Sequence, residues 1–219
     1  MTEVNIADLR KEYKLRSLLE KDVDPDPIKQ FQLWWNEAMM SNIEEPNAMT
    51  LATSNSKGKP SARIVLLKGL SNEGFAFYTN YESRKGKELK ENPHASLLFF
   101  WKELERQVRV EGTVSKADEE KSNEYFSSRP AASKLGAWSS PQSSVIKSRD
   151  ELDENVKKYQ QQFGEGNIPK PQHWGGYVVK PTLIEFWQGR PSRLHDRIQY
   201  TLLADGRWKI ERLAGGILR

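Results

Sequence analysis

Apolar residues recur at helical spacing in the first part of the chain. Asp26 followed by Pro27 is typical of a helix start, because an Asp side chain caps the free amides of the first turn and proline fits its first position. Five apolar side chains then share one face of a 3.6-residue period: Ile28, Phe31, Trp35, Ala38 and Met39. The pattern predicts a helix from Pro27 to about Ser41.

From Ala48 onwards the period changes to the alternation that is typical of strands. Turn residues at 57–58 (Lys-Gly) and 72–74 (Asn-Glu-Gly) separate the first segments, so neighbouring strands are expected to form antiparallel hairpins. The strands predicted in this region are residues 48–55, 60–70, 75–80, 94–102 and 106–116.

Helical and strand segments alternate in the rest of the chain. Ser83 is expected to cap a short helix that ends before Pro93. The predicted helices are residues 84–92, 118–128 and 149–163, and the Ser-rich segment 131–148 is predicted to be a structured loop. The C-terminal part returns to strands, predicted at residues 174–180, 183–189, 194–203 and 207–213, the last two around an Asp-Gly turn.

Together these segments favour an α+β fold, a barrel of short antiparallel strands with four flanking helices. A chain of 219 residues fits a single core. Residues 1–22 are rich in charge and precede the Asp-Pro-Asp-Pro block at 24–27. We therefore expect a mobile N-terminal arm, residues 1–22, followed by one domain, residues 23–219.

Composition narrows the function classes. The absence of cysteine excludes disulfides and Cys-ligated metals and fits a cytoplasmic protein, and no window approaches the 18 apolar residues of a membrane span. The 34 basic residues are interleaved with 30 acidic ones, so we expect no nucleic-acid partner. The three histidines lie far apart, which disfavours a metal site, and the motifs GxGxxG, GxxxxGK[ST] and GxSxG do not occur.

Two cationic segments lie beside predicted strand ends and helix starts. In residues 63–68, strand alternation places Arg63 and Lys68 on opposite faces, and an edge strand with solvated charges is the alternative interpretation. Arg84 and Lys85 begin a predicted helix, where cations oppose the helix dipole unless an anion such as phosphate binds the free amides. Ordinary surface cations are the alternative there.

Two more segments join cations to hydrogen-bond donors. Tyr125, Arg129 and Ser133 surround a predicted helix end and suit a phosphate group, although Arg129 could equally complement the helix dipole. In the fourth segment, alternation would place Arg193, His195 and Arg197 on one strand face near Trp187. Such a group is costly to bury unless it meets an anionic or electron-rich ligand, so a binding site is favoured.

Eight segments, taken together, resemble the pyridoxamine 5′-phosphate oxidase family. They are RIVLLK, FYTN followed by SRKG, LERQVRVEG, YFSSRP, GAWSS with QSS, WGGY, EFWQG and RLHDR. The likeness runs from about Leu9 to Leu213, with the segments in the order and at the spacing of that family.

The resemblance implies an FMN-binding split β-barrel that forms a homodimer, with two FMN in clefts between the subunits. By matching motifs, the residues implied to contact FMN are Arg63, Ile64, Val65, Leu66, Leu67, Lys68, Tyr78, Thr79, Arg84, Lys85, Gln107, Gln142, Ser143, Trp187 and Arg197. Those implied to bind the substrate are Arg10, Tyr13, Lys68, Tyr125, Arg129, Ser133, Arg193, Leu194 and His195. His195 and Arg193 are implied to be catalytic, with no metal.

The implied reaction belongs to vitamin B6 metabolism. Pyridoxine or pyridoxamine 5′-phosphate would give a hydride from C4′ to flavin N5, and O₂ would be reduced to hydrogen peroxide. The alcohol would leave pyridoxal 5′-phosphate directly, whereas the amine would leave an imine that water hydrolyses to pyridoxal 5′-phosphate and ammonia. Cations near the flavin ring, such as Arg197, would stabilise the charge that develops there. Two alternatives stay open: another flavin-binding split-barrel protein, such as a flavin reductase or a haem-related member, and a non-catalytic carrier of FMN or pyridoxal phosphate.

Overall fold

The structure, a computed structural model, describes residues 12–164 and 166–215. The chain divides into two compact units. Unit 1 consists of Met1–Pro46, Leu97–Val110 and Thr182–Arg219, and unit 2 of Asn47–Ser96 and Glu111–Pro181. The prediction that residues 23–219 form a single domain stays a prediction, and residues 1–11 of the predicted arm lie outside the described part.

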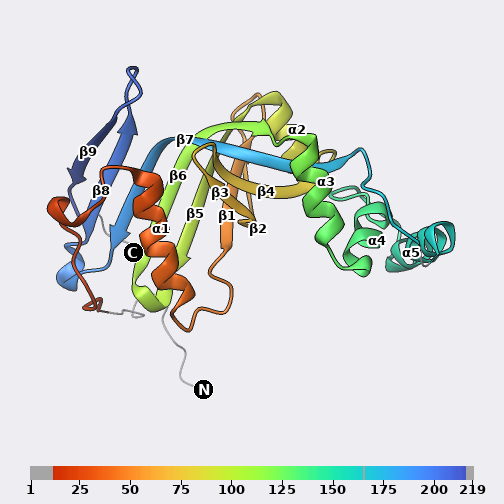
Figure 1. The fold of residues 1–219 in the computed structure, drawn as a ribbon, viewed down its shortest axis with the longest axis horizontal. Coiled ribbons are helices and arrows are strands. Elements are labelled where there is room, and N and C mark those ends of the chain that lie inside the picture. Colours follow the sequence, from red (N-terminus) through yellow and green to blue (C-terminus); the bar gives the residue numbers. More distant parts are fainter. Residues whose placement is uncertain (1–11, 165, 216–219) are drawn as a thin grey trace. The chain divides into compact units, whose positions relative to one another are not determined.

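Unit 2 is built on antiparallel hairpins (Figure 1). Strand β1 (Ala48–Ser54) pairs with β2 (Pro60–Leu66), and β3 (Gly69–Ser71) pairs with β4 (Gly74–Asn80), so both hairpins predicted around the two turns are confirmed. β4 in turn pairs with the first residues of β7 (Trp174–Gln188).

The strand order shows that this sheet curls. The order is β2-β1-β5-β6-β7-β4-β3, with β5 at His94–Trp101 and β6 at Arg106–Lys116. β2 and β3 stand at opposite ends of this order, yet only two residues join them, and the three peptide steps from Leu66 to Gly69 span roughly 11 Å at most. The two edges must therefore lie close together, as in a barrel, and the predicted α+β barrel class is confirmed.

The strand predicted over residues 60–70 is wrong in one respect, because it is two strands. The backbone amide of Leu67 donates to the Asn47 carbonyl, whereas that of Lys68 donates to the Ala76 carbonyl. The chain thus changes its hydrogen-bonding neighbour between these two residues. Conversely, the two strands predicted at 174–180 and 183–189 are one continuous strand, β7, which contains Pro181.

Four helices belong to unit 2, and three were predicted. They are α2 (Arg84–Glu91), α3 (Glu119–Ser128), α4 (Ala131–Ser139) and α5 (Arg149–Phe163). The predicted cap of α2 is confirmed, since the Ser83 hydroxyl accepts from the Gly86 amide.

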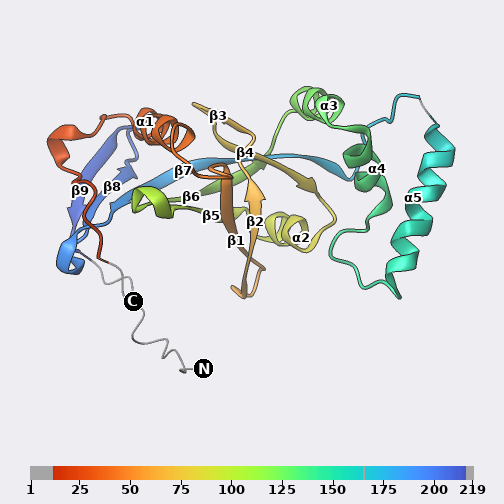
Figure 2. The same cartoon turned by 90° about the horizontal axis from the view of Figure 1, so that it is seen from below.

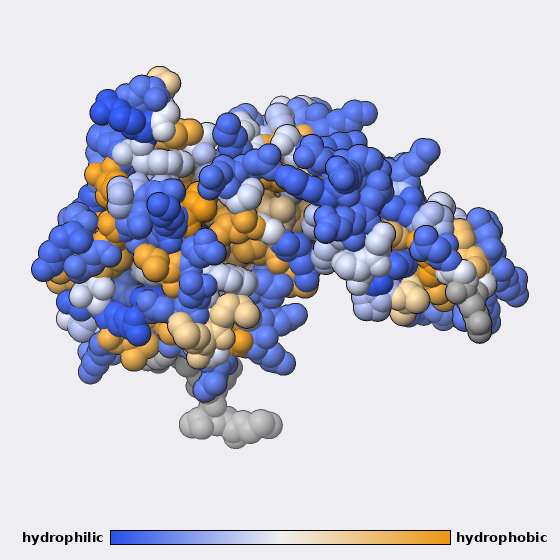
Figure 3. Space-filling view, viewed as in Figure 1, coloured by the Kyte–Doolittle hydropathy of each residue, from blue (hydrophilic) through white to orange (hydrophobic). Residues whose placement is uncertain are grey.

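The loop prediction for residues 131–148 is wrong over α4. This helix packs along α5, with the Trp138 ring 5.2 Å from that of Phe163. A small apolar patch surfaces where the two helices meet (Figure 3). Tertiary packing stabilises α4 despite its Ser and Gly residues.

Unit 1 contains α1 (Pro27–Met39) and the hairpin of β8 (Asp196–Leu202) and β9 (Trp208–Leu213), as predicted (Figure 2). The Asp26 carboxylate caps α1 by accepting from the Ile28 amide. Of the two tryptophans in α1, Trp34 is buried rather than the predicted Trp35. The Trp34 ring lies 5.2 Å from that of Phe186 on β7. Short 3-10 turns occur at Glu20–Asp22, Lys102–Leu104 and Pro191–Arg193.

Candidate active site

Unit 2 contains a cavity of about 610 Å³, within the usual range for small-ligand sites. It gathers most of the cofactor and substrate residues predicted in this unit, namely Arg63, Ile64, Val65, Leu66, Lys68, Tyr78, Thr79, Arg84, Lys85, Tyr125, Arg129, Gln142 and Ser143. Ser61, Ala62 and Trp174 also line it and were missed, although Trp174 belongs to the WGGY segment. None of the described residues lining the cavity is acidic.

Two predicted residues of unit 2 do not line this cavity. Leu67 is buried in the core with an exposed fraction of 7%, so its side chain faces away from the space that its neighbours line. Ser133 lies in the first turn of α4, where its backbone amide donates to the Pro130 carbonyl.

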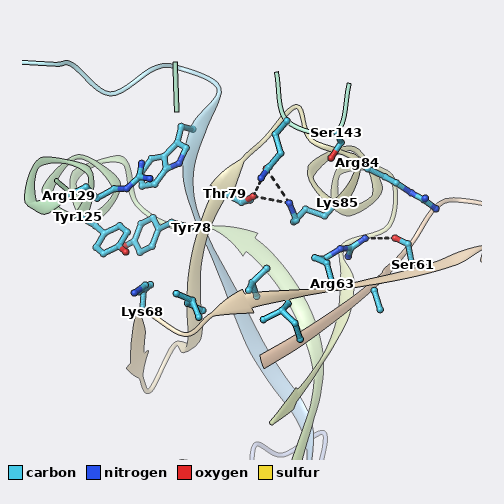
Figure 4. Close-up of a pocket in the computed structure, with 16 residues that line it drawn as sticks. Ser61, Arg63, Lys68, Tyr78, Thr79, Arg84, Lys85, Tyr125, Arg129 and Ser143 are labelled. Atoms are coloured by element: carbon cyan, nitrogen blue, oxygen red, sulfur yellow. Dashed lines mark hydrogen bonds between the residues drawn. The ribbon is translucent and has the colours of Figure 1, made fainter. Parts of the chain in front are cut away.

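Lys85 is a buried cation at the start of α2. Its Nζ lies 3.2 Å from Thr79 Oγ1 and 3.2 Å from Gln142 Oε1, and only 7% of the residue is exposed (Figure 4). Burial lowers the pKa of Lys85 to about 8, and the positive charge of Arg63 adds to this effect. Its hydrogen-bond partners are neutral, so an anion in the cavity would gain most from its charge.

Glu88, on the inner side of α2, holds the two arginines of this group. Its Oε1 accepts from Arg84 Nε at 2.9 Å, and its Oε2 lies 3.4 Å from Arg63 Nη2. Burial raises the pKa of Glu88, but hydrogen bonds from Ser61, Thr53 and Arg84 together lower it to about 2. The carboxylate therefore stays charged and orients both guanidinium groups, while 58% of the Arg84 side chain remains exposed. Sequence analysis missed Glu88, which follows Arg84 by one helical turn.

A second polar group lies on the other side of the same cavity, formed by Lys68, Tyr125 and Arg129 (Figure 4). The Tyr78 and Tyr125 rings stack at 4.1 Å, and Arg129 Cζ lies 4.8 Å from the centre of the Trp174 ring. Arg129 Nη1 is buried without a hydrogen-bond partner. A buried donor left unsatisfied costs about 1–3 kcal/mol or more when charged, so this atom fits an anionic ligand.

In unit 1, His195 lies against Trp187, with ring centres 4.6 Å apart, and is 5% exposed. Its Nδ1 accepts the Arg190 backbone amide at 3.0 Å. Because a backbone amide can only donate, the neutral imidazole must carry its proton on Nε2. Burial, followed by the positive charge of Arg193, lowers the pKa of His195. Neutral His195 thus offers an Nε2–H donor.

Arg193 occupies a strained loop, not a strand. Ser192 and Arg193 have φ angles of 56° and 63°, a conformation that non-glycine residues rarely adopt. β8 begins only at Asp196, so the predicted alternation of Arg193, His195 and Arg197 on one strand face is wrong. Arg193 and Leu194 are exposed, unlike His195.

Arg197 is held by a buried carboxylate that sequence analysis missed. Glu185 Oε1 accepts from Arg197 Nε at 2.7 Å, and Oε2 accepts from Arg109 Nη2 at 2.6 Å. Burial raises the pKa of Glu185, but the hydrogen bonds from both arginines outweigh it and lower that pKa. Gln107, the remaining predicted cofactor residue, lies on β6 in the same unit.

Within residues 12–164 and 166–215, no group of three or more His, Cys, Asp or Glu side chains comes together as a metal site would require. Over the same residues, no helix combines the length and apolar content that crossing a bilayer demands.

Two family models match this sequence. The model described as pyridoxamine 5′-phosphate oxidase covers residues 36–163, and the one described as the pyridoxine 5′-phosphate oxidase C-terminal dimerisation region covers residues 174–215. Proteins named pyridoxine/pyridoxamine 5′-phosphate oxidase from Cupriavidus metallidurans and Salinibacter ruber are each 58% identical, over 95% of this chain and 98% of theirs.

Solved structures show a similar fold. PhzG from Burkholderia lata 383, in complex with tetrahydrophenazine-1-carboxylic acid, is 28% identical with a TM-score of 0.86, covering 92% of this chain and 99% of that one. A pyridoxamine 5′-phosphate oxidase-related, FMN binding protein from Nostoc punctiforme is 16% identical with a TM-score of 0.67, over 87% and 99% of the two chains.

Proposed function

Because the chain belongs to the pyridoxamine 5′-phosphate oxidase family, we propose that it oxidises pyridoxine or pyridoxamine 5′-phosphate to pyridoxal 5′-phosphate, using FMN and O₂. The observation that carries this proposal is the cavity of unit 2, with separate cationic groups on its two sides. A flavin mononucleotide and a phosphorylated pyridine each bring one phosphate ester, so two cationic groups match two anionic ligands.

The first group suits the FMN phosphate. Arg63, Arg84 and Lys85 supply positive charge beside the free amides of the α2 N-terminus, a common place for phosphate. Thr79, Gln142 and Ser143 add neutral polar groups. All the FMN contacts expected from the sequence stay predictions, and four of those residues do not line this cavity: Leu67, Gln107, Trp187 and Arg197.

The second group suits the substrate phosphate. Lys68 contributes a point charge, Tyr125 a hydroxyl, and Arg129 a guanidinium group with one unsatisfied nitrogen. Ser133, Arg10 and Tyr13 stay predicted substrate residues, and Arg10 lies outside the described part of the chain.

When bound, FMN would supply the redox chemistry, namely a hydride acceptor for C4′ and a route for the two electrons to O₂, with hydrogen peroxide as the product. In the tautomer fixed by Arg190, His195 would donate a hydrogen bond from Nε2 and orient the oxygen or nitrogen on C4′, while the proton that leaves this atom would pass to water. Arg197, fixed by Glu185, supplies positive charge for an electron-rich ring. The proposed role of His195 rests on its tautomer, and that of Arg197 on its pairing with Glu185.

The protein is proposed to act as a homodimer, in agreement with the match of residues 174–215 to a dimerisation region. Light scattering of the purified holoprotein should give twice the mass of 25.3 kDa. A monomer that holds stoichiometric FMN would contradict this. A cytoplasmic location is part of the proposal and is checked by cell fractionation.

The activity is tested on the purified protein. A bound flavin spectrum should bleach when pyridoxamine 5′-phosphate is added without oxygen, and admitting air should restore the colour and release hydrogen peroxide. A carrier would bind these ligands without bleaching, and a different flavin-binding split-barrel protein would not respond to this substrate. Either result would overturn the proposal.

A further inference from the structure

We propose that Glu105 is a positioning residue that anchors residues 13–15 of the N-terminal segment and so holds Tyr13 against Trp187 and His195. Its effect on catalysis rests on the proposed function, whereas the anchoring itself does not. All of these residues belong to unit 1.

The Glu105 carboxylate binds the N-terminal segment directly. Its Oε2 accepts from the backbone amides of Lys14 at 2.8 Å and Leu15 at 3.1 Å, across about 90 residues of sequence. Only 4% of Glu105 is exposed. A buried carboxylate needs donors, and charge-assisted bonds of this kind are roughly twice as strong as neutral ones. The contact is therefore a strong restraint on residues 14 and 15.

The backbone of Glu105 is tied to the end of β7 at the same time. Its carbonyl oxygen accepts from the Gly189 amide at 2.8 Å and from Gln188 Nε2 at 3.2 Å. One residue thus links the N-terminal segment, through its side chain, to the chain that follows Trp187, through its main chain.

Glu105 also has a strained backbone, with φ 54° and ψ 41°. Strained conformations persist where the surroundings impose them, commonly at functional sites. Among the described residues, the other non-glycine residues with positive φ are Ser143, Ser192 and Arg193, all in the cavity or the loop before His195. Neither the sequence nor the proposed function provides a role for Glu105.

Tyr13 lies in contact with the segment that Glu105 restrains. A Cβ atom at Gly189 would lie 2.7 Å from both Cβ and Cγ of Tyr13, an approach that only glycine permits. The Tyr13 ring meets that of Trp187 edge-on at 5.7 Å and that of His195 at 5.9 Å. Loss of the anchor would free Tyr13 from the residues proposed to orient the reacting end of the substrate.

The test compares Glu105→Gln with Glu103→Gln, the same change at an exposed carboxylate two residues earlier. In the FMN-loaded enzyme, Glu105→Gln should speed tryptic cleavage after Lys14 and Arg16 by about tenfold, the difference between a charge-assisted and a neutral hydrogen bond. It should raise KM for pyridoxamine 5′-phosphate by a similar factor. Glu103→Gln should change neither quantity.

The role of Tyr13 is tested by repeating Glu105→Gln in a Tyr13→Ala background. The cleavage should again accelerate, but KM should not rise further, because the residue being positioned is already gone. An equal additional rise in KM would overturn the positioning of Tyr13, and unchanged cleavage in Glu105→Gln would overturn the anchor. If Glu105→Gln does not fold, Gly189→Ala, which displaces Tyr13 directly, must raise KM instead, and an unchanged KM refutes the proposal. Cleavage rates stay informative even for a protein that does not oxidise this substrate.

Discussion

The cavity of unit 2 differs in its balance of charge from a cluster in unit 1 formed by Trp187, His195, Glu185 and Arg197, the Trp187–His195 cluster. Around the cavity, five cations project into a space that no described acidic residue lines: Arg63, Lys68, Arg84, Lys85 and Arg129. Glu88 pairs with Arg63 and Arg84, and no described carboxylate pairs with the other three, so positive charge remains in excess. In the cluster, by contrast, the charge of Arg197 is matched by Glu185, and the pKa of His195 is lowered so that its ring is neutral.

This difference separates binding from chemistry. An excess of cations binds anionic groups that carry the same charge in the ground state and the transition state, which gives affinity without acceleration. Matched charges and a fixed tautomer contribute little affinity but orient reacting atoms. Substitutions in unit 2 should therefore act mainly on binding, and substitutions in the cluster mainly on turnover.

The largest effect is expected from His195→Ala. Loss of its orienting Nε2–H should lower kcat by roughly 10- to 1,000-fold, with the flavin still bound. Arg193→Ala is expected to act in the same direction. Steady-state kinetics checks this, with His94→Ala, an exposed histidine at the start of β5, as the control. An unchanged kcat would mean that the cluster does not meet the reacting end.

Arg129→Ala should raise KM by about 10- to 100-fold, since hydrogen bonds to charged groups contribute about 1.5–3 kcal/mol. The effect on kcat should be smaller, because the substrate phosphate is remote from C4′. Arg149→Ala, which removes an arginine with 81% of its side chain exposed, serves as the control. Loss of flavin without a change in KM would reassign Arg129 to the cofactor.

Arg84→Ala should weaken FMN binding by about 1.5 to 3 kcal/mol, with the lower value favoured by the exposure of this side chain. Riboflavin lacks the phosphate, so its affinity should not change. Lys87→Ala removes an exposed cation from the same helix and controls for general charge. Fluorescence titration measures both affinities. An equal loss of affinity for FMN and for riboflavin would show that Arg84 does not contact the phosphate.

The smallest effect concerns pH. Lys85 has its pKa lowered to about 8, so it loses its charge in the free protein above that pH. A phosphate dianion favours the protonated form, and binding must then take up a proton. The FMN dissociation constant should be flat from pH 7 to 8 and rise above it by at most about tenfold per pH unit. Lys85→Met should abolish this rise in the dissociation constant. If the rise persists in Lys85→Met, a group other than Lys85 causes it.

Local patterns were sufficient for the elements that depend on neighbouring residues. The cap at Asp26 and the Asp205-Gly206 turn correctly predicted α1 and the β8–β9 hairpin. Helix α4 was missed because its stability comes from packing on α5, and the division of residues 60–70 was missed because it depends on two different partner strands. The residues of α4 alone do not indicate packing on α5, and residues 60–70 alone do not indicate which strands they pair with.

The candidate site, like the fold, was predictable from the sequence only in part. Its cations were found from motifs, but the roles of Glu88 and Glu185, which orient them, were not. Glu185 contacts Arg109 across 76 residues, and Glu105 contacts the backbone amide of Lys14 across 91. A single sequence contains no signal for contacts across such separations, whereas the four-residue spacing of Arg84 and Glu88 on a predicted helix was a usable signal. The tautomer of His195 likewise depends on the loop before it.

The division between binding and chemistry is tested most directly by rapid mixing of the FMN-loaded enzyme with pyridoxamine 5′-phosphate without oxygen, which separates substrate affinity from the rate of flavin bleaching. Arg129→Ala should need about 10- to 100-fold more substrate for half-saturation and then bleach at nearly the normal limiting rate. His195→Ala should saturate normally and bleach slowly. The opposite pattern, with a slow limiting rate in Arg129→Ala and weak binding in His195→Ala, would contradict the account.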